Sequence, residues 1–185
     1  MSLSDLKSRM PEFAKDTKLN LGKISEEGMP GLNEAQIAGI ALASAYATKH
    51  ADVIQAVSGE FTSQLGEAGR TAAKAAASIM GMNNIYYRFV HLVSDKEYGK
   101  LPANLRMNVI GNPGVEKVDF ELMSLAVSAI NGCGMCIDAH VHEVSKAGIS
   151  KEGVQSAIRI AAILNAAAQT LIIEAQDEGN IAAAA

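Results

Sequence analysis

The sequence predicts an all-α protein, a compact helical bundle formed by residues 1–176. Alanine, the residue with the highest helix propensity, is very abundant. Glycine and proline fall mostly between the alanine-rich runs, and no stretch alternates β-branched residues around hairpin turns. With 185 residues, 49% of them hydrophobic, the chain can bury well over half of its unfolded surface. We therefore expect a single domain that folds without disulfide staples.

The first half of the chain contains several helix signals. A first helix is expected at 4–14, and a polar, glycine-containing stretch follows at 15–31. Asn33 has the character of an N-cap before the long apolar run at 37–47. Further helical segments are expected at 50–57 and 67–77, and a connection with a short helix at 94–114.

The second half opens with Asp119, a second N-cap candidate. Asn131 and Gly132 predict a break, Gly148 the end of the next helix, and Ser150 the cap of the last one. The expected helices are 120–130, about 133–147 and about 151–175, with a frayed tail at 177–185.

The two halves resemble each other, which suggests an internal duplication of about 30–92 and 117–176. Glu34 and Glu121 each open an apolar helix, 87 positions apart. In an alanine-rich chain such matches also arise by chance, so the repeat is a hypothesis. If it holds, only the second copy carries chemistry, because Tyr46 and Lys49 occupy the positions of the two cysteines.

Composition and charge restrict the classes of partner that the protein is expected to bind. The formal net charge is −4 and the pI is about 5.6. Phosphate binding needs clustered Lys and Arg, so this balance argues against nucleic acid. No segment reaches about 18 consecutive apolar residues, which argues against a membrane span. The start, Met1 to Lys7, lacks the apolar core of a signal peptide, and we expect a cytoplasmic protein.

The chain has two cysteines, Cys133 and Cys136, three positions apart. A bridge over so short a loop removes little chain entropy and makes a poor staple. In a cytoplasmic protein the pair indicates a redox centre or half of a metal site. In the first turn of a helix the two side chains share a face, and the helix N-terminus stabilises a thiolate. The alternative is two ordinary buried cysteines.

His140 and Glu121 are candidate partners of the thiols. His140 follows Cys136 by four positions on the same helical face and could accept the thiol proton. His142 would face elsewhere, and we interpret His50 and His91 as structural. In one unbroken helix Glu121 would lie about 18 Å from Cys133. Unless the chain folds back at the predicted break, Glu121 is better explained as a first-turn acid.

Zinc binding is the rival chemistry. Cys133, Cys136 and His140 could each bind Zn²⁺, but a structural site needs a fourth protein ligand. Glu121, a distant histidine or a neighbouring subunit would have to supply it. The alternative hypothesis is thus a non-enzymatic zinc-binding or redox-sensing subunit.

Taken together, Glu121, eleven intervening residues, Cys133-x-x-Cys136, three intervening residues and His140 resemble the active-site pattern of the alkyl hydroperoxidase D family. The segment 126–133 before the cysteines and the segment 80–88 in the first half are also similar to that family. The resemblance covers nearly the whole chain, and the combined motif is far more specific than a CxxC alone.

This resemblance implies an all-helical fold of two related halves and a homotrimer. It implies an antioxidant peroxidase that reduces organic hydroperoxides beside the peroxiredoxin alkyl hydroperoxide reductase C. Electrons would come from the dihydrolipoyl group of a lipoylated acyltransferase, and the enzyme itself would bind no cofactor or metal. Cys136 would attack the peroxide, Cys133 would resolve the intermediate as a redox-active disulfide, and Glu121 and His140 would relay protons.

One position departs from the family pattern. Some members carry a histidine immediately before the second cysteine, where this chain has Met135. The relay would then rely more on His140 and Glu121. Two other activities stay open: a relay of electrons to a peroxiredoxin with slow peroxidase activity, and a carboxymuconolactone-type decarboxylase. The paired thiols disfavour the decarboxylase, which does not need them.

Overall fold

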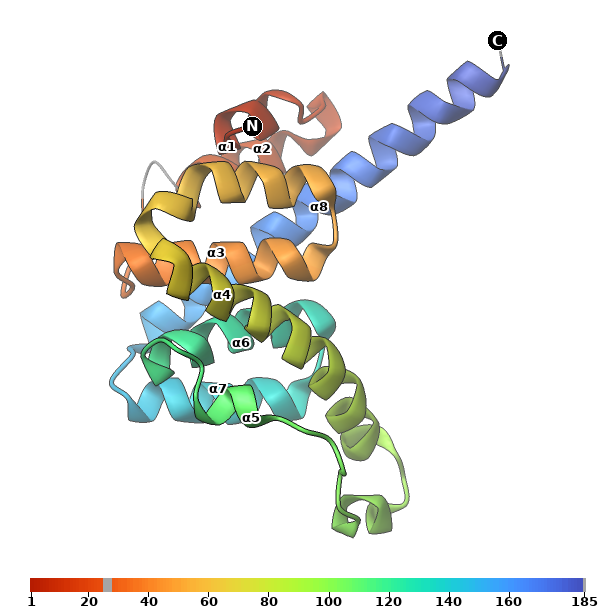
Figure 1. Ribbon diagram of the computed structural model, residues 1–185. Coiled ribbons are helices and arrows are strands. Elements are labelled where there is room, and N and C mark those ends of the chain that lie inside the picture. Colours follow the sequence, from red (N-terminus) through yellow and green to blue (C-terminus); the bar gives the residue numbers. More distant parts are fainter. Residues whose placement is uncertain (25–27, 185) are drawn as a thin grey trace.

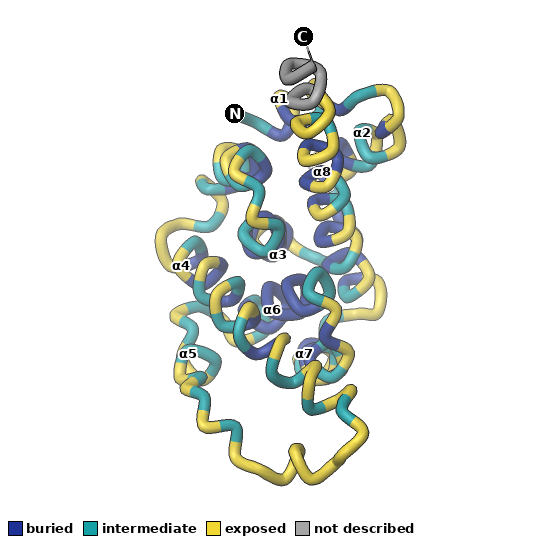
Figure 2. The backbone as a smooth tube through the Cα atoms, turned by 90° about the vertical axis from the view of Figure 1, so that its right-hand side faces the viewer, coloured by how far each residue is buried: buried dark blue, intermediate teal, exposed yellow. Residues whose placement is uncertain are grey.

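Two helices that are buried on every side occupy the centre of the molecule: α3 (Glu34–Thr48) and α6 (Lys117–Asn131). In α3 ten consecutive residues, 36–45, are buried, and in α6 nine, 120–128. A helix that is apolar all round belongs in a core, and the other helices cover these two. Figure 2 shows α6 in the colour of buried residues near the centre of the molecule.

The computed structural model describes the backbone of residues 1–24 and 28–184 and the side chains as far as Asp177. Within these residues it contains helices and turns and no strand, so the all-α prediction is confirmed. Figure 1 shows α4 crossing the front of the bundle, with α8 behind. The remaining elements are α1 (Leu3–Ser8), η1 (Glu12–Ala14), α2 (Lys15–Gly22), α4 (Ala51–Leu92), η3 (Lys96–Lys100), α5 (Asn108–Gly111), α7 (Gly134–Lys146) and α8 (Lys151–Ala184).

The start of the chain differs from its prediction. The single helix expected at 4–14 is interrupted, because Pro11 cannot continue a helix and restricts the residue before it. The stretch expected to be irregular, 15–31, begins instead with α2. Part of that stretch, 25–27, lies outside the described residues.

The caps of the two central helices are linked to each other. Asn33 caps α3 as predicted, in a capping box with Gln36. The Gln36 side chain also donates from Nε2 to Asp119 Oδ1 at 3.0 Å. The prediction that Asp119 caps α6 is therefore wrong: the helix begins two residues earlier, at Lys117, and the Asp119 carboxylate binds the neighbouring helix instead.

Each central helix opens a helix–turn–helix unit of the same design. Both α3 and α6 have 15 residues and end at a residue with left-handed backbone, Lys49 (φ 62°) and Gly132 (φ 69°). The two helices start 83 positions apart (117 − 34), so this register differs from the 87 suggested by Glu34 and Glu121. It places Cys133 opposite His50. Gly66 (φ 61°) bends α4 into two segments (Figure 1), much as Gly148 separates α7 from α8. An evolutionary duplication stays a prediction.

The last helix begins at the predicted cap, where Ser150 Oγ accepts from the amide of Gly153 at 3.1 Å. It extends to Ala184, beyond the expected end near 175, whereas the fraying predicted for 177–185 stays untested. By length and composition alone, residues 151–177 of this helix could cross a membrane. Half of its apolar window is buried against the body of the protein, which is the pattern of a core helix.

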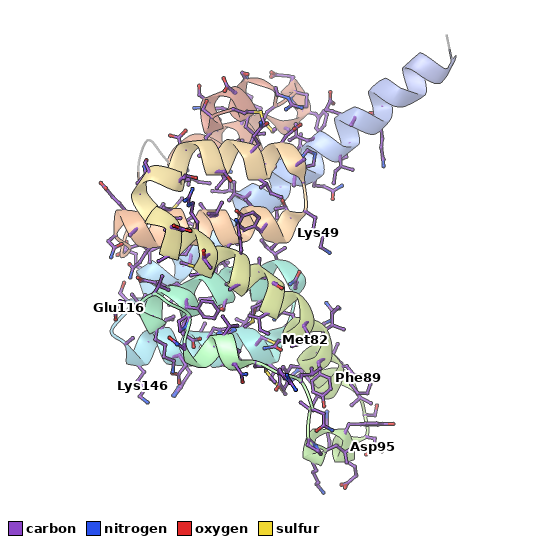
Figure 3. All side chains as sticks on the ribbon, viewed as in Figure 1. Lys49, Met82, Phe89, Asp95, Glu116 and Lys146 are labelled. Carbon is purple, nitrogen blue, oxygen red and sulfur yellow. A yellow bond between two sulfur atoms is a disulfide. The ribbon has the colours of Figure 1, made fainter. Side chains whose placement is uncertain are left out.

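The connection predicted at 94–114, with a short helix, is confirmed. Its first part, 94–101, belongs to a projecting arm, residues 85–101, made by the end of α4 together with η3. The rings of Phe89 and Tyr98 meet edge to face at 5.3 Å and join these two elements. Figures 1 and 3 show the arm extending away from the bundle, with Phe89 and Asp95 on it.

Candidate active site

The turn between α6 and α7 positions the cysteines. Gly132 adopts the left-handed backbone that favours glycine, and its amide donates to the Ala129 carbonyl. The next amide, that of Cys133, donates to the Ser128 carbonyl, which completes a Schellman ending. The break predicted at Asn131 and Gly132 is thereby confirmed. Because the chain reverses here, α7 packs back along α6.

Cys133 and Cys136 are joined in a disulfide, with Cα atoms 5.3 Å apart. Cys133 is the N-cap of α7 rather than its first-turn residue, and its sulfur accepts from the Cys136 amide at 3.3 Å. The two sulfurs differ in surroundings. Cys133 is fully buried in the turn, whereas Cys136 lines a cavity. An outside reactant can therefore approach Cys136 more directly than Cys133.

Glu121 and His140 form a buried pair. His140 Nδ1 and Glu121 Oε2 are 2.6 Å apart, and both side chains are about nine-tenths buried. The reversal at Gly132 makes this contact possible, since it carries α7 back toward the start of α6. The structure thus places Glu121 beside His140, which lies one helical turn beyond Cys136, although sequence spacing alone favoured a first-turn acid at this position.

Met80 of α4 fixes the other side of the imidazole. Its sulfur lies 3.3 Å from His140 Nε2 and 3.8 Å from Asn84 Nδ2. A thioether sulfur can only accept a hydrogen bond. The contact with His140 is thus a hydrogen bond only when Nε2 carries a proton, and in that state a proton faces the cavity next to Cys136.

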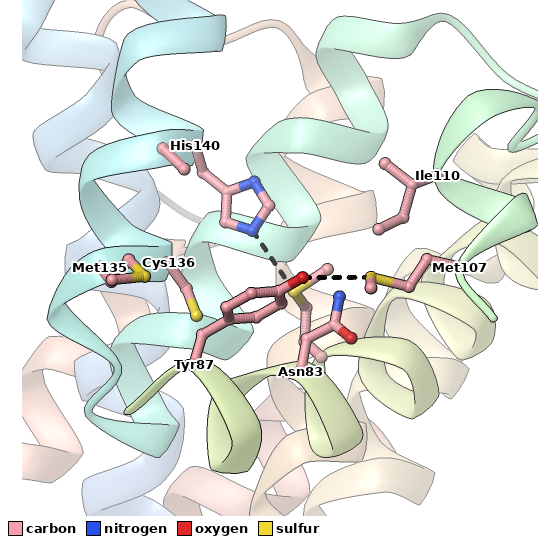
Figure 4. Close-up of a pocket in the computed structure, with 9 residues that line it drawn as sticks. Asn83, Tyr87, Met107, Ile110, Met135, Cys136 and His140 are labelled. Carbon is pink, nitrogen blue, oxygen red and sulfur yellow. Dashed lines mark hydrogen bonds between the residues drawn. The ribbon is translucent and has the colours of Figure 1, made fainter. Parts of the chain in front are cut away.

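The cavity beside Cys136 has a volume of about 290 Å³. Figure 4 shows its walls, contributed by α4, α7 and α5 with the preceding residue, Met107. Tyr87 donates from its hydroxyl to the sulfur of Met107 across the cavity, at 3.9 Å. The lining residues are mostly apolar: Met80, Asn83, Tyr87, Met107, Ile110, Met135, Cys136, Ala139 and His140.

Most of this lining was not predicted from the sequence. The segment 80–88 was singled out only as similar to a family, without a role for any residue in it. A usable signal was present, namely two consecutive asparagines, Asn83 and Asn84, at the end of an alanine-rich apolar helix. Both are buried, and buried amides require partners.

Asn84 and Arg88 connect α4 to the turn that carries the cysteines. Asn84 donates from Nδ2 to Ser128 Oγ at 2.9 Å and accepts from Asn131 Nδ2 at 2.9 Å. Arg88 donates to the carbonyl of Asn131 at 2.6 Å. These bonds place the cavity wall of α4 in a fixed position relative to Cys133.

A second cavity, of about 300 Å³, borders Glu121 on the side away from Cys136. Lys117 and Glu143 face each other there at 3.0 Å. Their hydrogen bond raises the pKa of Lys117 and lowers the pKa of the Glu143 carboxyl. The Glu121–His140 pair therefore borders two cavities, one with charged side chains in its lining and one with mostly apolar walls.

The other histidines lie outside the site. His142 and His91 are exposed, and His50 is the N-cap residue of α4. In the described part of the chain, no three side chains of His, Cys, Asp or Glu are grouped as they would be around a metal ion.

Comparison with known proteins identifies the family. Three relatives are each named alkyl hydroperoxide reductase AhpD. The protein of Coxiella burnetii strain RSA 493 is 58% identical over 93% of this chain and 98% of its own length. The protein of Rhodospirillum centenum is 55% identical over 97% of this chain and 95% of its own length. The protein of Brucella suis is 54% identical over 96% of this chain and 99% of its own length.

The chain belongs to the AhpD family. The recognition made from the motif spanning Glu121 to His140 is confirmed. The model of the carboxymuconolactone decarboxylase family also matches, over residues 96–176. That match covers α6, α7 and most of α8, the part of this AhpD family member that contains both cysteines.

Proposed function

We propose that the protein is an alkyl hydroperoxide reductase that uses Cys133 and Cys136 as a redox pair in antioxidant defence. The observation that carries this proposal is the geometry around Cys136. Its sulfur borders a cavity with apolar walls, belongs to a disulfide, and lies beside a buried His140–Glu121 pair. The names of the relatives support the same activity.

In the first step, the Cys136 thiolate attacks the terminal oxygen of the hydroperoxide. The O–O bond breaks, the sulfur becomes a sulfenic acid, and the alkoxide leaves. His140 supplies the proton that converts the alkoxide to the alcohol, from the nitrogen that faces Met80 in the resting structure. Glu121 orients the imidazole and stabilises its charged form. The cavity behind Glu121 offers a route for proton exchange with solvent.

In the second step, the Cys133 thiol attacks the sulfenic sulfur, which releases water and leaves the disulfide seen here. We propose that a dihydrolipoyl group on a lipoylated acyltransferase then reduces the disulfide by thiol exchange. The cycle consumes one hydroperoxide and two thiols of the donor, and yields an alcohol, water and the donor disulfide. No bound cofactor is needed for these steps.

A role in recycling the peroxiredoxin alkyl hydroperoxide reductase C is the second part of the proposal. The same dithiol pair could reduce a partner's disulfide, because exchange needs only an accessible low-pKa thiol. We further propose that the protein works in the cytoplasm, where lipoylated enzymes supply dithiols. The arrangement of possible metal ligands in the described residues does not favour a zinc-binding subunit. The paired thiols do not favour a decarboxylase, because that chemistry does not need them.

A titration of the reduced protein tests this function. One equivalent of cumene hydroperoxide should remove two free thiols per chain and release one cumyl alcohol. Turnover should continue when dihydrolipoamide is supplied. Retention of both thiols, or one tightly bound Zn²⁺ per chain in freshly purified protein, would contradict the proposal. If hydroperoxide is consumed only when the peroxiredoxin is added, the protein acts as an electron relay to the peroxiredoxin and not as a peroxidase itself.

The homotrimer is also a proposal, which the apolar surface of the arm supports. Ile85, Phe89 and Leu92 follow one another on one helical face and are 65%, 48% and 69% exposed. We expect light scattering to give three times the chain mass of 19.4 kDa. Leu92→Glu should dissociate the assembly, whereas Leu19→Glu, at an equally apolar exposed position on α2, should leave it intact. A monomeric wild-type protein would refute the trimer.

A further inference from the structure

Asn83 presents a polar group to the cavity that the steps above leave without a role. The residue is only 4% exposed, and its amide oxygen Oδ1 has no hydrogen-bond partner. It nevertheless lines the cavity together with Cys136 and His140. Figure 4 shows its side chain rising from α4 beside Tyr87 and Met107. Leaving a buried amide oxygen unpaired is costly, so the position calls for an explanation.

The neighbouring residue shows that the cost can be avoided at this place in the helix. Asn84 is also buried, and its amide both donates to Ser128 and accepts from Asn131. One asparagine of the pair therefore completes a structural network, whereas the other lines the cavity beside Cys136. Packing alone would be satisfied at position 83 by an apolar residue of similar size.

Other buried side-chain atoms in the described residues also lack partners, but none of them belongs to this cavity. They are Ser44 Oγ, Ser124 Oγ and His50 Nδ1. Asn83 differs from them because it lines the same cavity as Cys136, with its unpaired amide oxygen in the cavity wall.

We propose that the Asn83 amide binds the hydroperoxide group and orients it for attack by Cys136, an inference that rests on the proposed function. A hydroperoxide has one donor, its terminal O–H, and acceptor lone pairs on both oxygens. A side-chain amide offers the complementary acceptor and donors. Oδ1 accepts from the terminal O–H, while Nδ2 donates to the oxygen that carries the alkyl group. Asn83 is thus a catalytic residue in contact with substrate.

This arrangement accounts for the direction of the reaction. The terminal oxygen is held toward the Cys136 sulfur, and the alkyl-bearing oxygen becomes the leaving alkoxide. Nδ2 stabilises the charge that develops on this alkoxide before His140 protonates it. The rest of the lining supplies thioether and hydrocarbon surface for the organic group. Sulfur is oxidised by two electrons, the O–O bond accepts them, and Asn83 itself is unchanged.

Stopped-flow oxidation of the reduced protein by cumene hydroperoxide tests the proposal. Asn83→Leu should lower the second-order rate by about tenfold or more, the effect of losing a hydrogen bond to substrate. Alkylation of Cys136 by iodoacetamide in the same variant should change by less than about twofold. The Tm should stay the same or rise. Asn84→Leu should behave differently, with a lower Tm and an unchanged ratio of oxidation rate to alkylation rate.

Asn83→Ala provides a second measurement if the leucine variant folds poorly. Added acetamide should restore part of its oxidation rate and leave its alkylation rate unchanged. Equal oxidation rates for wild type and Asn83→Leu would overturn the inference and leave the proposed function intact. So would an equal loss of oxidation and alkylation, which would mean that Asn83 only shapes Cys136. Failure of the wild-type protein to lose thiols would instead reject the proposed function.

Discussion

Cys136→Ser should abolish reduction of organic hydroperoxides, with a loss on the order of 10³-fold or more, because a serine oxygen cannot be oxidised to a sulfenic acid and cannot form the disulfide. In the proposed cycle Cys136, which borders the cavity, is the cysteine whose loss removes the first step. The measurement is the rate of hydroperoxide consumption with dihydrolipoamide as donor. The fold should be retained, because the residues around the cavity do not depend on this sulfur for a hydrogen bond.

Cys133→Ser is the matched control and should have a different outcome. One hydroperoxide should still be reduced, but the product should persist as a sulfenic acid on Cys136, since the resolving thiol is missing. Mass spectrometry after one equivalent of hydroperoxide would detect the added oxygen. A persistent sulfenic acid on Cys133 in the Cys136→Ser variant would reverse the assignment of the two cysteines.

Local signals predicted the helices well where a cap or a break is encoded in a few residues. Asn33, Gly132 and Ser150 each mark a boundary through one side chain or one backbone angle, and each was recognised. The prediction for Asp119 was wrong because an acidic residue near a helix start can either cap its own helix or bind a neighbouring helix. Its partner, Gln36, lies 83 residues away, and no local pattern reveals it.

The site was predicted unevenly for the same reason. The relation of Cys136 to His140 is local, since four positions in a helix define a shared face. Glu121 depends on the reversal at Gly132, so helix geometry alone left it doubtful and the family pattern alone supported it. The wall contributed by α4, which includes Met80 and Asn83, comes from the other half of the chain. Tertiary packing brings this part of α4 next to Cys136, and the spacing of residues along the sequence does not reveal that proximity.

The structure locates Met135, the residue that departs from the family pattern. It lines the cavity beside Cys136. A thioether enlarges the apolar wall and can neither donate nor carry a proton. In the proposed cycle, proton transfer would therefore depend on His140, the one titratable nitrogen among the lining residues, and through it on Glu121.

Glu121→Gln should lower the rate of Cys136 oxidation by about 10²-fold, the usual contribution of a positioned acid–base group. Glutamine preserves the shape and can still bond to the imidazole, but it does not stabilise the charged ring. The second-order rate of Cys136 oxidation by cumene hydroperoxide, measured by stopped flow, would detect this loss. An unchanged rate would remove Glu121 from the relay.

Stability separates this catalytic role from a structural one. His140→Leu leaves the Glu121 carboxylate buried without its partner, and breaking such a pair costs about 3 kcal/mol or more. In the double variant Glu121→Leu with His140→Leu, no charge is left unpaired, so urea unfolding should recover most of the lost free energy. The double variant should nevertheless be as inactive as the single one. Stability without activity is the expected result if the pair is retained for proton transfer; a double variant as unstable as His140→Leu would mean that the pair chiefly supports the fold.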